Sequence, residues 1–219
     1  MTIHDTFAAL LAWTPFLAAG FGWNVLISLV TMAIGTPAGY LLARGRLNGS
    51  RTAAFLTAAA RVPPTFVLIY YLAYLLPAEI AFGGHALPLP GWVKASLALA
   101  VAVTGFVSDN ALQALRHLKR GERIEALYFV PSWTTYFLII VMASSTASVI
   151  GVPEIVQRAN TVIAAIGDDH AILAVYLYVM AYFLVFCWPL ARLLSYVRVR
   201  LASRAGTGTG IRMAPLAAE

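Results

Sequence analysis

The chain has 219 residues, of which 61% are hydrophobic and only 11% are charged. Because soluble domains usually carry about 25% charged residues, this composition argues against a soluble protein and predicts an integral membrane protein. The net charge of +6 would suit a nucleic-acid partner in a soluble protein. Here the Lys and Arg residues gather in short loops between apolar runs, as they do on the cytoplasmic side of membrane proteins, so we expect no nucleic-acid partner.

The cysteine and histidine content gives no indication of a metal or cofactor. Cys187 is the single cysteine, so no disulfide can form within the chain, and the four histidines are scattered without metal-ligand spacing. No loop of the phosphate-binding type occurs, because GTGTG near the C-terminus is followed by no Lys-Ser/Thr and preceded by no strand. We therefore expect no metal, no cofactor and no catalytic residue.

The apolar runs predict an all-α membrane protein with about five transmembrane helices of roughly 20 residues each. The expected spans cover residues 23–43, 61–78, 93–115, 128–150 and 170–194. Residues 6–19 are expected to form a separate helix at the membrane interface, because Gly20 and Gly22 interrupt the apolar run before the first span. The spans predict one transmembrane domain over residues 1–205 and a flexible cytoplasmic tail over 206–219.

The loops predict the orientation of the chain. Lys and Arg concentrate at 44–51, 116–123 and 192–204, whereas the Gly/Pro-rich loop 79–92 has none and 151–169 has only Arg158. Because cytoplasmic loops carry the excess of Lys and Arg, alternation across five spans places the N-terminus outside and the C-terminus in the cytoplasm.

Polar groups inside or beside the spans are the first candidate functional residues. Asp109 lies towards the end of the third span, and an acid at the bilayer centre costs about 2.5–3.5 kcal/mol, so it marks either a function or an interface acid that pairs with a loop Arg. Ser144, Ser145 and Thr146 make the end of the fourth span polar. Their hydroxyls either bond to their own helix backbone or line a path for a hydrophilic solute.

The segment after the fourth span predicts a second kind of helix. Pro153 followed by Glu154 is a helix-start signal, and polar and apolar residues then mix over 154–166, which is typical of an amphipathic helix at the membrane surface. Asp168 and Asp169 follow in a turn. This acidic pair suits the positive end of the next helix and does not require a catalytic role.

Several stretches resemble the permease subunits of ABC importers in the polar amino acid uptake family. SSTASVIGVPEI, residues 144–155, is similar to the family's Thr-Ser-Leu-Ala-Ser-Val-Ile-Gly-Val-Pro-Glu-Leu, and this is the most specific match. ARVPPTFVLIYYLAYLLP, residues 60–77, resembles a family stretch that begins Arg-Gly-Thr-Pro, and Asp109 falls where the family has a Glu. The resemblance covers roughly residues 18–200 and implies an ABC importer type I-like transmembrane fold.

The resemblance also implies a contact with an ATPase. In the family, a cytoplasmic loop forms a short coupling helix that sits in a groove of the ATPase subunit. Its opening is matched within 116–127 by Gly121, Glu122, Glu125, Ala126 and Leu127. The two Glu residues either contact the ATPase or only solvate the loop. Asp109 and Arg61 are expected at the base of this loop, in an organising or gating role.

Two departures from the family leave alternatives open. The loop is about ten residues shorter than the family pattern, so the coupling helix is roughly halved. Met142 and Ala143 stand where the family often has a Lys-Asp pair. The chain is therefore expected to be either a working permease, a degenerate permease partner or scaffold with weakened coupling, or an ATP-independent transporter. No inverted repeat of spans favours the last of these.

The function that the resemblance implies is transport rather than catalysis. The chain would be the inner-membrane permease subunit of an importer that moves a polar amino acid or a similar small polar solute inward. A separate ABC ATPase subunit would bind ATP, an external solute-binding protein would deliver the solute, and a second permease subunit, identical or not, would complete the pathway in the lipid bilayer.

Overall fold

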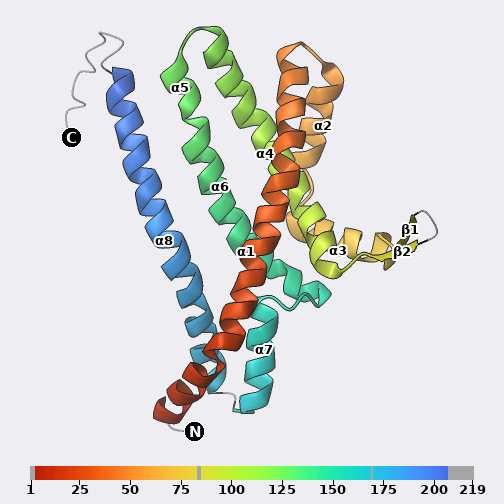
Figure 1. The fold of residues 1–219 in the computed structure, drawn as a ribbon, viewed down its shortest axis with the longest axis vertical. Helices are drawn as coiled ribbons and strands as arrows, with labels where there is room; N and C mark the ends of the chain where they lie inside the picture. Colours follow the sequence, from red (N-terminus) through yellow and green to blue (C-terminus); the bar gives the residue numbers. More distant parts are fainter. Residues whose placement is uncertain (1–2, 83–84, 169, 207–219) are drawn as a thin grey trace.

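The computed structural model of the protein describes residues 3–82, 85–168 and 170–206. Within these ranges the chain is almost entirely helical (Figure 1). In chain order the elements are α1 (Ile3–Leu47), α2 (Arg51–Arg61), α3 (Thr65–Leu75), β1 (Glu79–Phe82), β2 (His85–Pro88), α4 (Gly91–Lys119), α5 (Arg123–Leu127), α6 (Phe129–Ala143), the 3₁₀ helix η1 (Ser144–Ile150), α7 (Ile155–Ile166) and α8 (Ala171–Gly206). Apart from Gly206, the predicted tail lies outside the described residues, as does Asp169.

Four segments in the described part of the chain are long and apolar enough to cross a membrane. They are Phe7–Leu47, Gly91–Lys119, Arg123–Ile150 and Ala171–Leu201. The α2–α3 pair, bent by 96°, gives a fifth if it is counted as one broken span. The length and composition of these helices agree with the all-α membrane fold predicted from the sequence.

Helix α1 runs without interruption through the glycines at which a break was expected. A glycine in a helix costs only about 1 kcal/mol relative to Ala, so it need not end one. A Cβ at Gly20 would lie 2.9 Å from the Cα of Ile155, whereas a Cβ at Gly22 would meet nothing within 4 Å. Because Gly20 has no side chain, the start of α7 can pack against α1 at this point. The separate helix expected over residues 6–19 is part of α1.

Within the second expected span, residues 61–78, the structure has the shorter helix α3. Helix α2 ends at Arg61 and α3 begins at Thr65 after Pro63 and Pro64. The two prolines lack the backbone N–H that a continuing helix needs, so α2 ends before them and α3 begins directly after them, with Pro64 at its N-cap. With 11 residues, α3 is about 16 Å long, shorter than the hydrocarbon core of about 30 Å.

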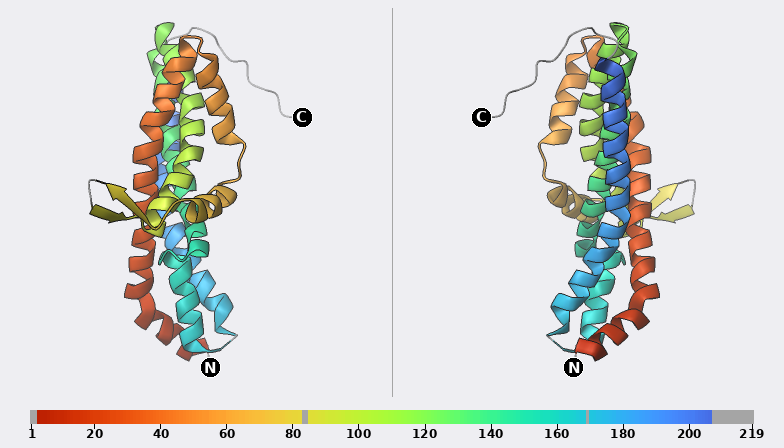
Figure 2. Two further views of the ribbon diagram at one scale, coloured as in Figure 1. Left: turned by 90° about the vertical axis from the view of Figure 1, so that its right-hand side faces the viewer. Right: turned by 90° about the vertical axis from the view of Figure 1, so that its left-hand side faces the viewer.

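Helix α3 and the hairpin β1–β2 project sideways from the bundle (Figure 2). Where the sequence predicted only a Gly/Pro-rich loop, the two strands pair antiparallel, with Ile80 opposite Leu87. The buried Lys94 fixes the end of α3, because its Nζ donates hydrogen bonds to the carbonyl oxygens of Ala73 at 3.0 Å and Leu76 at 2.8 Å.

Glycines let α1 and α4 pack closely. A Cβ at Gly35 would lie 2.6 Å from Cβ of Val103, and a Cβ at Gly39 would lie 2.7 Å from both the Thr104 carbonyl oxygen and Cβ of Val107. Small residues serve this purpose between membrane helices. Gly35 and Gly39 therefore serve the close packing of α1 on α4.

One face of helix α7 packs against α1 and α8. It buries Ile155, Ala159 and Val162 against Leu17 of α1 and Val175 of α8. Its sequence is amphipathic, as predicted, but its apolar face meets other helices and is not left for the membrane surface. A second and larger core joins α1, α4 and α6.

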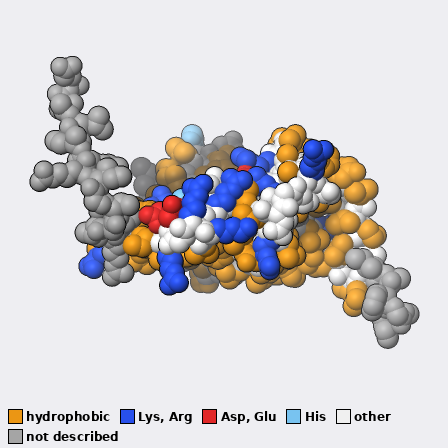
Figure 3. Space-filling view, turned by 90° about the horizontal axis from the view of Figure 1, so that it is seen from above, with side chains coloured by type: hydrophobic (Ala, Val, Ile, Leu, Met, Phe, Trp, Pro, Cys, Tyr) orange, Lys and Arg blue, Asp and Glu red, His pale blue; other side chains and the backbone are white. Residues whose placement is uncertain are grey.

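The basic loops lie together at one end of the bundle, opposite the N-terminus (Figure 1). Arg44 and Arg46 are in the last turn of α1, and Arg116 and Lys119 are in the last turn of α4. Viewed onto this end, Lys and Arg side chains lie across the middle of the described surface, with hydrophobic side chains around them (Figure 3). That this end faces the cytoplasm remains a prediction from the distribution of basic residues.

Candidate functional site: a charged hollow between α2, α4 and α6

Asp109 of α4 joins three helices. Its Oδ1 accepts a hydrogen bond from Nη1 of Arg46 in α1 at 2.6 Å, and its Oδ2 accepts one from Nη1 of Arg61 in α2. Arg46 Nη1 also donates to the Ser108 hydroxyl at 3.1 Å, which lies 2.7 Å from the Thr57 hydroxyl of α2. The structure thus brings the two predicted loop-base residues, Asp109 and Arg61, together and adds Arg46.

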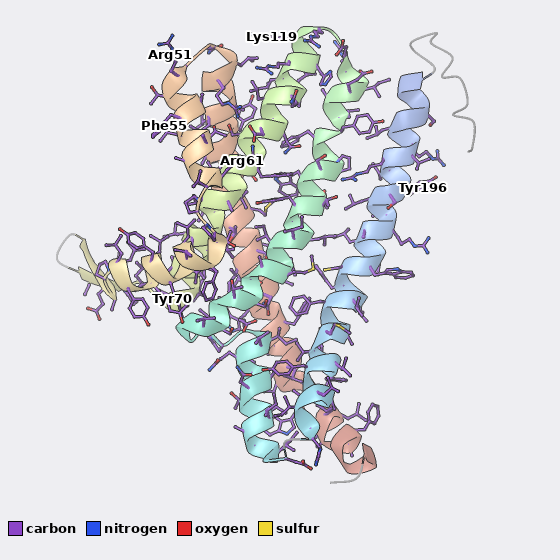
Figure 4. The ribbon with its side chains drawn as sticks, turned by 180° about the vertical axis from the view of Figure 1, so that it is seen from behind. Arg51, Phe55, Arg61, Tyr70, Lys119 and Tyr196 are labelled. Carbon is purple, nitrogen blue, oxygen red and sulfur yellow. The ribbon has the colours of Figure 1, made fainter. Side chains whose placement is uncertain are left out.

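A hollow of about 470 Å³ opens beside this charged cluster. Its volume falls in the range of small-molecule sites, about 300–1,000 Å³. Arg61 lies at the junction of α2 and α3, alongside α4 (Figure 4). On the other side, the ring of Tyr136 from α6 stacks on that of Phe106 from α4, with centroids 3.8 Å apart. The hollow therefore has a charged rim and an aromatic wall.

The polar groups of the hollow have hydrogen-bonding capacity to spare. Asp109 is shared by two arginines, so the cluster carries a net charge of about +1, and the Arg61 side chain is 63% exposed. Among the described residues, neither the Tyr136 hydroxyl nor Oδ1 of Asn110, which also lines the hollow, has a protein hydrogen-bond partner. The Arg61 guanidinium and the Tyr136 hydroxyl can donate to a carboxylate, and Asn110 Oδ1 can accept from an N–H group of a solute.

The predicted coupling loop forms a turn and a helix of five residues, α5. Gly121 takes the left-handed conformation, with φ of +80°, and so ends α4 in the usual way. The Glu122 carboxylate lies 2.6 Å from Nδ1 of His117 on α4. Glu122 is thus engaged within the chain, at the point where the resemblance implies a contact with an ATPase.

The other predicted loop residues differ in their exposure. Glu125 lines a smaller hollow of about 240 Å³ with His117 and Tyr128. Ala126 is buried, whereas the Leu127 side chain is exposed. Of the predicted set, Gly121 and Leu127 are therefore open to a partner, Glu125 is partly so, and Ala126 packs inward.

The predicted solute-path hydroxyls of η1 lie apart from the charged hollow. Each donates to the carbonyl oxygen three residues earlier, with distances of 2.8 Å for Ser144, 2.7 Å for Ser145 and 2.7 Å for Thr146. Ser144 is fully buried. Ser145 lines an open groove of about 330 Å³ with Tyr176 of α8. A role for these hydroxyls in the solute path stays a prediction.

The sequence did not indicate a polar cluster at the centre of the bundle. The side chains of Asn24, Ser144 and Glu154 are all fully buried. Asn24 Nδ2 donates to the Glu154 carboxylate at 2.9 Å and to the Ser144 hydroxyl at 3.0 Å, and Asn24 Oδ1 accepts from the Ile155 N–H at 3.1 Å. The available signal was an amide in an otherwise apolar run of the first span, since such side chains bond between membrane helices.

No protein-family model matches the chain, and no curated protein matches it. Among solved structures, the chain is similar to a chain in the crystal structure of an amino acid ABC transporter with histidines. The TM-score is 0.72 and the identity 18%, and the match covers 91% of this chain and 100% of that chain. A likeness at this identity shows the fold. The chain thus has the all-α membrane fold of a chain of an amino acid ABC transporter, as its sequence predicted.

Proposed function

We propose that the chain is the membrane-spanning permease subunit of a binding-protein-dependent ABC importer in the cell inner membrane. The observation that carries the proposal is the fold, which matches the whole length of a chain of an amino acid ABC transporter. That transporter is described with histidines. A polar amino acid or a similar small polar solute is therefore the class of solute that we assign to this chain.

The charged hollow supports the same class of solute. An amino acid carries a carboxylate, and the exposed guanidinium of Arg61 is a donor that can bind it bidentately. Asp109 holds Arg61 in place, while the Phe106–Tyr136 wall offers apolar contact. In this proposal the hollow is a station on the solute's route, in addition to the path predicted along Ser144, Ser145 and Thr146.

The basic end of the bundle supports docking of a separate ATPase subunit. In this proposal α5 and the turn before it enter the ATPase, with Gly121, Leu127 and Glu125 as contacts. Because Asp109 ties α4 to α1 and α2, a displacement of the loop is passed to these three helices together. The other partners are a second permease subunit and an external solute-binding protein.

Copurification with the candidate ABC ATPase tests the proposal. We expect the ATPase to copurify with the wild-type chain and to be lost when residues 116–130 are replaced by Gly/Ser. Glu125→Ala should weaken the complex several-fold. Glu79→Ala is the matched control, because Glu79 is an exposed acid at the start of β1 in the projecting hairpin and should leave the yield unchanged.

The alternatives give different outcomes in the same experiment. A wild-type chain that binds a second permease but no ATPase would support a degenerate partner or scaffold. A chain that takes up solute in proteoliposomes without any ATPase would be an ATP-independent transporter. Either result would overturn the proposed coupling.

A further inference from the structure

Four side chains form a ladder on the exposed face of α8. Trp188, Arg192, Tyr196 and Arg200 follow one another at intervals of four residues, so each lies on the turn next to the last. The guanidinium carbon of Arg192 lies 5.4 Å from the ring centroid of Trp188, and that of Arg200 lies 4.9 Å from the ring centroid of Tyr196. Two cation–π pairs are thus stacked along the helix. These four residues are called the α8 ladder below.

The ladder faces away from the rest of the chain. The Trp188 and Tyr196 side chains are 62% and 54% exposed, and Tyr196 points away from the bundle (Figure 4). Only 17% of the apolar window of α8 is buried, against 56% for α4. In a membrane protein, a helix with so much exposed apolar surface contacts lipid.

The positive charges of the ladder are not neutralised by the chain. Helix α8 contains no Asp or Glu, and in the described part of the molecule neither Arg192 nor Arg200 forms an ion pair. Arg198 is different, because its Nη2 donates to the Thr135 hydroxyl of α6 at 2.9 Å. The ladder arginines therefore do not serve the packing of α8.

A guanidinium stacked on a ring keeps its N–H edge available for a phosphate. Arg192 and Arg200 are about 12 Å apart along the helix. With Arg200 at headgroup level, the Arg192 guanidinium stacked on Trp188 lies about 12 Å deeper, so it reaches a headgroup by leaving that ring and extending its long side chain. Trp and Tyr prefer this interface. A shallow hollow of about 200 Å³, lined by Tyr196, Arg200 and the apolar Val197 and Leu201, lies where the acyl chains would begin.

We propose that the α8 ladder binds the headgroup of an anionic phospholipid of the bilayer, with the two guanidinium groups on phosphate oxygens and the two rings beside the acyl chains. The charge complementarity, the lipid-facing surface and the apolar hollow favour this occupant over a protein partner. The proposal is independent of ATPase coupling and holds for a scaffold as well as for a permease.

Native mass spectrometry of the purified full chain in detergent tests the proposal. The chain is titrated with dioleoyl-phosphatidylglycerol and, separately, with dioleoyl-phosphatidylcholine. We expect the wild type to bind the anionic lipid at least fivefold more tightly. The Arg192→Gln/Arg200→Gln variant should lose that preference, because each Arg near an anionic lipid contributes about fivefold.

Three further variants separate the ladder from general charge. Arg51→Gln/Arg120→Gln removes two exposed arginines from the same end of the bundle, and we expect it to keep the preference. The Arg192→Lys/Arg200→Lys variant keeps the charge but loses the planar stacking. It should retain only part of the preference for the anionic lipid. Trp188→Leu/Tyr196→Leu should also lower the preference, by about twofold to threefold. Thermal unfolding of each variant checks that it is folded.

Several results would overturn the proposal. Equal binding of the two lipids by the wild type would leave the ladder without a phosphate-binding role. An equal loss in the Arg51/Arg120 control would show attraction to a basic surface only. Ladder variants that keep the lipid preference but lose a copurifying protein subunit would show that a protein covers this face.

Discussion

The buried cluster around Asn24 offers the sharpest test of what holds the bundle together. Replacing Asn24 by Leu keeps the side chain's approximate size but removes its amide. The Glu154 carboxylate then loses its bond at 2.9 Å, and the Ile155 N–H loses its acceptor at 3.1 Å. Leaving a buried donor or acceptor without its hydrogen-bond partner costs about 1–3 kcal/mol for each group. Two groups lose a partner, but Glu154 keeps the N–H of Gln157 at 2.9 Å, so we expect a combined loss of about 3 kcal/mol.

The assay is the free energy of unfolding of the purified chain, from titration with dodecyl sulfate in mixed micelles followed by circular dichroism. Asn24→Leu should lower it by about 3 kcal/mol. Gln113→Leu is the control, because this amide is exposed on α4, and its effect should stay within about 0.5 kcal/mol.

A double-mutant cycle distinguishes the loss of the Asn24–Glu154 hydrogen bond from poorer packing of the new side chain. Replacing both partners of a buried hydrogen bond with apolar groups leaves neither of them unpaired, so Asn24→Leu/Glu154→Leu should be less destabilising than the sum of the single variants by about 1–3 kcal/mol. Additive losses, or a loss below about 1 kcal/mol for Asn24→Leu, would refute the claim that this bond organises the centre of the bundle.

Two further predictions concern the close packing of α1 and the charged hollow. Gly39→Ala should lower the free energy of unfolding by about 1–3 kcal/mol, because the new Cβ collides with the α4 backbone; Gly22→Ala on the same helix should be neutral or stabilising, and equal effects would contradict the packing argument. Arg61→Gln should reduce uptake of a labelled polar amino acid by the assembled complex in proteoliposomes about tenfold or more, the value of a charged hydrogen bond; Arg51→Gln at the other end of α2 should not, and normal uptake with Arg61→Gln would exclude the hollow from the route.

The long apolar runs were enough to predict the membrane helices, because hydropathy reports the part of a helix that lies in lipid. It does not report where the helix ends. The expected span 93–115 is α4, which extends to Lys119 beyond the apolar stretch. Gly20 and Gly22 look alike in the sequence, yet only the first meets a neighbouring helix. That difference depends on packing and is invisible in a single sequence.

The candidate sites show a similar division. The position of Asp109 near a span end left open either a function or a pairing with a loop Arg, and the structure pairs it with both Arg46 and Arg61. Which arginines would lie there depends on the path of α1 and α2. The Asn24–Glu154 bond joins residues 130 positions apart. No local pattern encodes such a pair, and Glu154 was interpreted from its neighbours alone as a helix-start residue.

The two polar clusters lie far apart on α1, and this separates stability from transport. Asn24 and Arg46 are 22 positions apart, which is about 33 Å along a helix. The Asn24 cluster is fully buried and has its hydrogen bonds satisfied within the chain, so changes there should act on folding. The cluster that contains Arg61 and Asp109 is partly exposed and keeps free donors, so Arg61→Gln should act on the solute while leaving the free energy of unfolding within about 1 kcal/mol of the wild type, as for an exposed ion pair. A variant that moved both quantities equally would show that the hollow is part of the structural core.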